Sequence, residues 1–243
     1  MSTIDQPGQP RPGAGPRPKV LITGTGRAGT TLLVQVLTDL GMDTGFTSDA
    51  LVDEQARAGL EAPLDDPAGP RIVKSPTVIR RLGRLLASGT VELEHVIIPM
   101  RALDVAAASR VRQTKYGADL RTFGGLLGTR YATKQREALA LLQYELVYVL
   151  ATYDVPHTLL LFPRFASDWE YTHRKLGFLD PNVPATRWRE VFEARVVPGL
   201  IHEEPLSRRE RAMTVAGTTY NRLVARPARA VRKVWRGEPR SPR

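Results

Sequence analysis

The sequence predicts an α/β fold with a mostly parallel central sheet of about four to five strands and helices on both faces. Short apolar runs recur at 20–22, 71–74, 93–100 and 157–162, each typical of a buried parallel strand. Segments with helical periodicity separate these runs, and this alternation produces a three-layer α/β/α arrangement. A chain of 243 residues is long enough to enclose one such core.

Helices are expected in five segments that lie between or after these strands. The first ends at Gly41, a residue type that commonly follows a helix C-terminus. The longest has an apolar face that repeats every three to four residues, formed by Leu139, Leu142, Leu146, Val149 and Tyr153. The expected helices cover 30–40, 77–87, 103–115, 133–153 and 167–176.

The two ends of the chain differ in composition from the part between them. Residues 1–18 are rich in Pro, Gly and Gln without an apolar pattern, so we expect a disordered leader before a single domain at 19–225. Residues 226–243 carry seven Lys and Arg against Glu238, which is +6 of the net charge of +10. This basic tail is expected either to touch an anionic surface or membrane weakly or to stay solvated, with no specific nucleic-acid ligand.

Composition excludes several classes of chemistry. The chain has no cysteine, which excludes disulfides and thiolate catalysis, and its four His residues lack the spacing of a zinc site. We therefore expect no metal. No apolar run approaches the roughly 20 residues of a membrane span, and the N-terminus lacks a signal-peptide pattern, so a cytoplasmic protein is expected.

The stretch 19–33 (KVLITGTGRAGTTLL) combines a buried strand, a glycine-rich turn and the start of a helix. Gly24, Gly26 and Gly29 permit a tight turn whose backbone N–H groups can approach a ligand closely. Those N–H groups and the positive end of the helix dipole favour a phosphate group. The sequence therefore predicts a phosphate-binding loop here.

Two enzyme classes are alternative interpretations of this loop, and the first is a dinucleotide-binding reductase. The turn from Gly24 matches the GxGxxG pattern of dinucleotide-binding reductases, and Tyr171 and Lys175 form the YxxxK pair of short-chain dehydrogenases. That fingerprint also needs an acidic residue after a second strand, and Asp43 has no apolar strand before it.

A P-loop nucleotide kinase is the second competitor. Thr30 stands where its loop needs a lysine, and two strands end in Lys74 and Arg101 where a magnesium site needs carboxylates.

A third interpretation explains the residues at these strand ends together. Residues 27–31 (RAGTT) resemble the phosphosulfate-binding loop of the sulfotransferase family. Arg101 after a strand and Ser109 eight positions later resemble that family's second motif, and 74–76 (KSP) resembles the element between them. The resemblance covers roughly 19–179 and implies a P-loop α/β fold that uses 3′-phosphoadenosine 5′-phosphosulfate (PAPS) as co-substrate.

The resemblance also implies roles for individual residues. Arg101 and Ser109 are expected to hold the 3′-phosphate, and Phe162 stands where the family often has a tyrosine at a strand end. Arg27 and Lys74 are expected near the bridging oxygen and the sulfuryl group. The loop residues expected to hold the 5′-phosphate are Gly26, Arg27, Ala28, Gly29, Thr30 and Thr31.

The catalytic base and the acceptor are less clearly indicated. Pro76 stands where cytosolic members of the family carry a histidine base, so Asp49, in the segment after the first helix, is the candidate base. The acceptor is expected to be a hydroxyl or amine of a small molecule, glycan or lipid. A non-catalytic nucleotide-binding protein of the same fold stays open as an alternative, and the sequence does not predict an oligomeric state.

Overall fold

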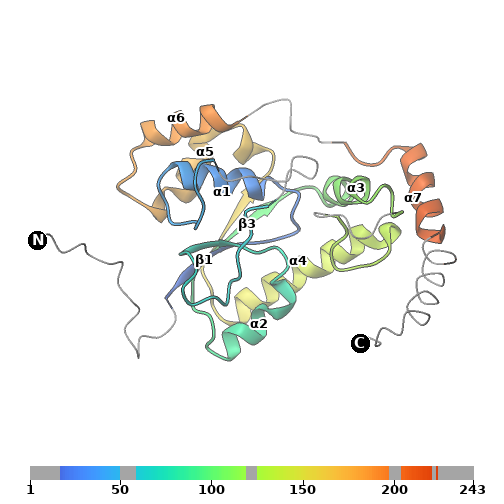
Figure 1. The fold of residues 1–243 in the computed structure, drawn as a ribbon, viewed down its shortest axis with the longest axis horizontal. Coiled ribbons are helices and arrows are strands. Elements are labelled where there is room, and N and C mark those ends of the chain that lie inside the picture. Colours follow the sequence, from blue (N-terminus) through green and yellow to red (C-terminus); the bar gives the residue numbers. More distant parts are fainter. Residues whose placement is uncertain (1–16, 50–58, 119–124, 197–203, 221–222, 224–243) are drawn as a thin grey trace, which may run out of the picture.

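The computed structural model describes residues 17–49, 59–118, 125–196, 204–220 and 223 of the chain (Figure 1). Residues 1–16 of the expected leader and the whole of the expected basic tail at 226–243 therefore lie outside the described residues.

The sheet has four strands, all parallel, in the order β2-β1-β3-β4. This confirms the predicted α/β class and its three layers. The chain order reverses direction between β1 and β3, and in such sheets ligands bind outside the carboxyl ends of the strands at this reversal. The strands are β1 (Lys19–Ile22), β2 (Ile72–Lys74), β3 (Leu93–Met100) and β4 (His157–Leu161).

The five predicted helices all form, with ends that differ by a few residues from the expected ranges. Two further helices, α6 and α7, were not predicted, and short 3-10 turns occur at Ala132–Lys134, Arg164–Ala166 and Gly177–Leu179. No helix in the described part of the chain is long and apolar enough to span a bilayer. The helices are α1 (Thr30–Asp39), α2 (Ile79–Ala87), α3 (Leu103–Gln113), α4 (Gln135–Thr152), α5 (Trp169–Leu176), α6 (Ala185–Arg195) and α7 (Arg208–Tyr220).

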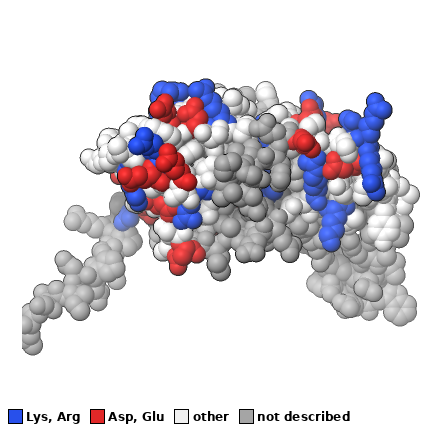
Figure 2. Space-filling view, turned by 90° about the horizontal axis from the view of Figure 1, so that it is seen from above, with Lys and Arg blue, Asp and Glu red and all other residues white. Residues whose placement is uncertain are grey.

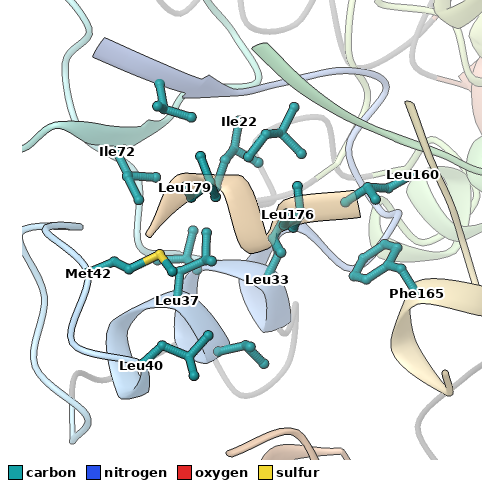
Figure 3. Packing of buried hydrophobic residues seen from close by; sticks show 14 of the residues in the cluster. Ile22, Leu33, Leu37, Leu40, Met42, Ile72, Leu160, Phe165, Leu176 and Leu179 are labelled. Carbon is teal, nitrogen blue, oxygen red and sulfur yellow. The ribbon is translucent and has the colours of Figure 1, made fainter. Parts of the chain in front are cut away.

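Alternation along the strands divides the core into two layers. Val20 and Ile22 of β1 face one side of the sheet, where they pack with residues of α1, α5 and α6 (Figures 1 and 3). Leu21 faces the other side and packs with residues of α2 and α4. Both faces are covered because a parallel sheet of apolar residues must be shielded from water on each side.

The predicted apolar face of α4 is confirmed at three of its positions and wrong at its C-terminal end. Leu139, Leu142 and Leu146 are buried, but Tyr153 lies just beyond the helix and is partly exposed. Its hydroxyl donates to the backbone oxygen of Gly83, in the middle of α2, at 3.2 Å. The phenol group explains this placement, because its polar end needs a hydrogen-bond partner or water.

Candidate anion-binding site

The loop between β1 and α1 has an unusual backbone. Gly26, Arg27 and Gly29 have φ angles of 62°, 54° and 73°, which lie in the left-handed region. Arg27 is the most informative of the three, because a residue with a Cβ atom is less stable in this conformation than in the right-handed one by about 1–2 kcal/mol. Mixed left- and right-handed residues direct backbone N–H groups into a shared concavity that suits an anion. The loop therefore has the backbone form of an anion-binding turn.

In the described part of the chain, α1 begins without a side-chain N-cap. The preceding residue is Gly29, which has no capping side chain, and the first turn of α1 contains no acidic residue. The N–H groups of a first helical turn have no acceptor within the helix, and they carry the positive end of the helix dipole. This end of α1 therefore favours an anion.

Gly29 is also required for packing beneath the loop. A Cβ atom at this position would lie 2.8 Å from Phe165 and 3.0 Å from Phe162. The two phenylalanine rings contact each other edge to face, with their centroids 5.7 Å apart. The predicted residue Phe162 thus lies directly against the loop, and the loop rests on this aromatic pair.

Residues from three separate segments meet beside the loop, at the carboxyl ends of β1 and β3. The Arg27 Nε atom donates to the Ser109 hydroxyl of α3 at 3.1 Å. Arg101 follows β3, and its Nη1 atom donates to the backbone oxygen of Arg27 at 2.7 Å. The Arg101 guanidinium also lies 4.9 Å from the centre of the Phe162 ring. The structure therefore brings together Arg27, Arg101, Ser109 and Phe162, which are distant in the sequence.

Lys74 closes the other side of the loop from the end of β2. Its buried Nζ atom donates to the Thr31 hydroxyl at 3.1 Å and to the backbone oxygen of Gly59, and it lies 3.8 Å from Glu61 Oε1. The pKa of Lys74 is lowered to about 8, chiefly by burial; Glu61 opposes the change and the positive charge of Arg27 adds to it. A nearby anion would strongly stabilise the protonated form of a lysine held in this way.

Arg110 is a site residue that the sequence analysis missed. It is buried on α3, where Nε and Nη2 donate to the backbone oxygen of Thr25 at 2.9 and 2.7 Å. Its Nη1 atom donates to the backbone oxygen of Gly125 at 2.5 Å. Burial lowers the pKa of Arg110 to about 10, and the charge of Arg27 contributes. No sequence motif marked it, because its role depends on which side of α3 faces the loop.

Glu61 is the second missed residue. It lies in the long connection after α1, and it lines a pocket of about 310 Å³ that begins beside Lys74. Asp65 lines the same pocket and pairs with Arg81 at 2.8 Å. The complete lining is Glu61, Ala62, Pro63, Leu64, Asp65, Ser75, Thr77, Val78 and Arg81.

Asp49 does not belong to this cluster. The neighbouring Ser48 oxygen accepts from Arg195 at 2.6 Å, and Arg195 also binds Asp39, the last residue of α1. A helix of this length spans about 15 Å, so Asp49 lies near the opposite end of α1 from the glycine loop. A hydrogen bond from Thr47 lowers the pKa of the Asp49 carboxyl, which weakens it as a base. The predicted role of Asp49 is therefore not supported by its position.

Tyr171, which suggested a reductase, has a structural role. It is buried on α5, and its hydroxyl accepts from the backbone N–H of Leu161 at 3.0 Å. The Arg164 guanidinium lies 4.4 Å from the centre of its ring. These contacts fix the position of α5 against β4 and account for the tyrosine without a catalytic function.

The comparisons with protein-family models, with curated proteins and with solved structures each found no match. Within the described ranges, no group of three or more His, Cys, Asp and Glu residues has the arrangement of a metal site. Function is therefore inferred from the geometry and charge of the loop and its surroundings.

Replacing Gly29 with alanine tests the packing of the loop. We expect Gly29→Ala to lower the free energy of unfolding by about 1–3 kcal/mol more than Gly41→Ala, measured by urea unfolding. Gly41 is the matched control because its φ is also positive, at 85°, while a Cβ there would meet nothing within 4 Å. Equal losses in the two variants would show that the aromatic pair does not constrain the loop.

Proposed function

We propose that this chain is a sulfotransferase that moves the sulfuryl group of PAPS to a hydroxyl or amine of a small-molecule, glycan or lipid acceptor. The observation that carries the proposal is the gathering of Arg27, Lys74, Arg101 and Arg110 around one glycine loop. The loop lies at the reversal of strand order, where ligands of such sheets bind.

The charges of this cluster favour a polyanion. Lys74 and Arg110 are buried, and each has a lowered pKa because burial and the charge of Arg27 disfavour its protonated form. The carboxylate that faces Lys74 is Glu61, at 3.8 Å. A ligand with several negative charges would relieve the repulsion among these cations, and a neutral ligand would not.

The second phosphate distinguishes PAPS from most other nucleotides. Arg101 and Ser109 both contact Arg27, so a ligand held at the loop can reach all three side chains. We assign them to the 3′-phosphate, and we assign the loop N–H groups and the start of α1 to the 5′-phosphate. Charge-assisted hydrogen bonds of this kind contribute about 1.5–3 kcal/mol each.

The transfer step requires stabilisation of negative charge and removal of a proton. PAPS supplies the sulfuryl group: the acceptor oxygen bonds to sulfur while the bond from sulfur to the bridging oxygen breaks. Lys74, with Thr31 beside it, stabilises the charge that develops on that oxygen. Glu61 takes the proton of the acceptor hydroxyl, and the electron pair of the broken bond leaves with the nucleotide.

The pocket beside Lys74 is where we place the acceptor. Glu61 and Ser75 line it, so an acceptor bound there lies next to the residues that act on the sulfuryl group. Glu61 is partly exposed, which lets an acceptor hydroxyl approach it directly. This assignment replaces Asp49, which lies near the opposite end of α1.

The alternatives make different demands on the same loop. A kinase needs a carboxylate at a strand end for magnesium, but β2 ends in Lys74 and β3 is followed by Arg101. A reductase needs a free catalytic tyrosine, but the Tyr171 hydroxyl is occupied by the backbone of β4. A non-catalytic nucleotide-binding protein is compatible with all of these residues, so only a turnover assay distinguishes it from a sulfotransferase.

The role of Arg101 is tested by ligands that differ in the 3′-phosphate alone. We expect the wild-type chain to prefer 3′-phosphoadenosine 5′-phosphate over 5′-AMP, measured by isothermal titration calorimetry. Arg101→Ala should reduce the affinity for the bisphosphate by about 10- to 100-fold while changing the affinity for 5′-AMP little.

The control is Arg84→Ala, which removes an exposed arginine of α2 and should leave both affinities unchanged. An equal loss for the two ligands in Arg101→Ala would contradict the assignment of the 3′-phosphate. Binding of NADPH or of ATP with magnesium in place of the bisphosphate would favour the reductase or the kinase.

The role of Glu61 is tested by turnover. We expect Glu61→Gln to slow release of 3′-phosphoadenosine 5′-phosphate from PAPS by about 100-fold or more across a panel of alcohols, sugars and amines, followed by chromatography. Its affinity for the bisphosphate should not fall, because Glu61 carries the same sign of charge as the ligand.

Asp65→Asn is the matched control, since Asp65 lines the same pocket and pairs with Arg81. Wild-type turnover in Glu61→Gln would exclude Glu61 as the base. Tight binding without turnover in the wild-type chain, over the whole panel, would favour the non-catalytic protein.

A further inference from the structure

Helix α7 contacts the rest of the domain through polar and small residues. Glu210 accepts hydrogen bonds from Arg112 Nε at 2.8 Å and from the Tyr116 hydroxyl at 3.2 Å. Thr214 is buried one turn later, and a Cβ atom at Gly217 would lie 2.5 Å from the backbone oxygen of Tyr116. The inward face of α7 is thus held by hydrogen bonds and close backbone contact.

After its first turn, α7 exposes uncharged and largely apolar side chains on its outward face, which is the reverse of the usual arrangement. The helical period of 3.6 residues identifies which residues lie opposite the side of Glu210 and Thr214. Val215, Tyr220 and Leu223 are 57%, 55% and 65% exposed. Within α7 the outward residues after Arg211 carry no charge: they are Ala212, Val215, Ala216 and Thr219, with Tyr220 at the edge of this face. Leu223 follows beyond the end of the helix.

Charge is concentrated in the same part of the chain. Residues 208–243 carry eleven Lys and Arg against two Glu, which is +9 of the net charge of +10. Figure 2 shows Lys and Arg side chains projecting at the end of the molecule where Figure 1 places α7. Arg208, Arg209 and Arg211 stand in the first turn of the helix, before the apolar face begins.

This combination identifies the kind of partner. Helices that lie in the headgroup layer of a membrane have an apolar face and flanking Lys and Arg residues that attract anionic lipids. A nucleic acid would use the positive charge but not the apolar face. A second copy of the chain would bring a second set of Arg208, Arg209 and Arg211 to the same surface, and this repulsion opposes pairing.

We propose that α7 docks this protein on the surface of an anionic phospholipid bilayer. Val215, Tyr220 and Leu223 enter the headgroup layer, and Arg208, Arg209 and Arg211 contact the lipid phosphates. The inward hydrogen bonds of Glu210 keep the domain attached to the docked helix. This inference is independent of sulfuryl transfer, since none of these residues belongs to the loop or its pocket.

Co-sedimentation with lipid vesicles tests the proposal on the full chain. We expect binding to vesicles of phosphatidylcholine with 30% phosphatidylglycerol, weaker binding as salt is raised, and little binding to phosphatidylcholine alone. The combined variant Val215→Ser, Tyr220→Ser and Leu223→Ser should bind the anionic vesicles at least about tenfold more weakly. Its thermal unfolding should match that of the wild-type chain, because the three side chains are exposed.

The matched control carries Leu141→Ser, Tyr144→Ser and Tyr148→Ser, three apolar residues of α4 that are equally exposed. It should bind like the wild-type chain, and an equal loss would show nonspecific adhesion instead of docking through α7. Unchanged binding of the α7 variant would assign attachment to the basic tail alone and overturn the proposal. So would binding to a DNA duplex but not to vesicles, or an α7-dependent dimer in analytical ultracentrifugation.

Discussion

Much of the site depends on the burial of positive charge next to one backbone loop. Lys74 and Arg110 are both buried, and both donate hydrogen bonds to groups of the loop or of the chain around it. Cations are seldom buried unless they are paired or bind an anion. Their lowered pKa values express the unfavourable free energy of this arrangement. Glu61, at 3.8 Å, offsets part of this cost for Lys74. An anion at the loop would stabilise the charged forms of both residues.

Most of the fold could be predicted from the sequence because its strands are short apolar runs and its first five helices have clear signals. The exceptions are α6 and α7. In α6 the apolar positions Trp188, Val191 and Phe192 lie among many charged residues, which hides the period. In α7 the buried residue is the polar Thr214, while the apolar Val215 and Tyr220 are exposed, so a prediction that places apolar residues inward fails.

Part of the cluster around the glycine loop could be predicted because its residues stand at or soon after strand ends. Lys74 ends β2, Arg101 follows β3, Arg27 lies in the loop after β1, and Ser109 lies on α3. The fold brings Arg27, Arg101 and Ser109 into contact. Glu61 reaches Lys74 only because the chain turns sharply before it, with φ values of 127° and 56° at Gly59 and Leu60. Whether Arg110 reaches the loop depends on the rotation of α3 about its axis. The position of Asp49 depends on the path of the connection after α1. Such tertiary features leave no pattern in a single sequence.

The central claim is that the cation cluster binds the bisphosphate nucleotide, and proton uptake tests it most directly. Calorimetric titration with 3′-phosphoadenosine 5′-phosphate at pH 8.5, in two buffers of different ionisation enthalpy, measures protons taken up on binding. Lys74 has a pKa of about 8 without ligand, and a bound anion raises it. The account predicts uptake of roughly half a proton or more in the wild-type chain, and none in Lys74→Met. Absence of binding, or binding without proton uptake, would contradict it.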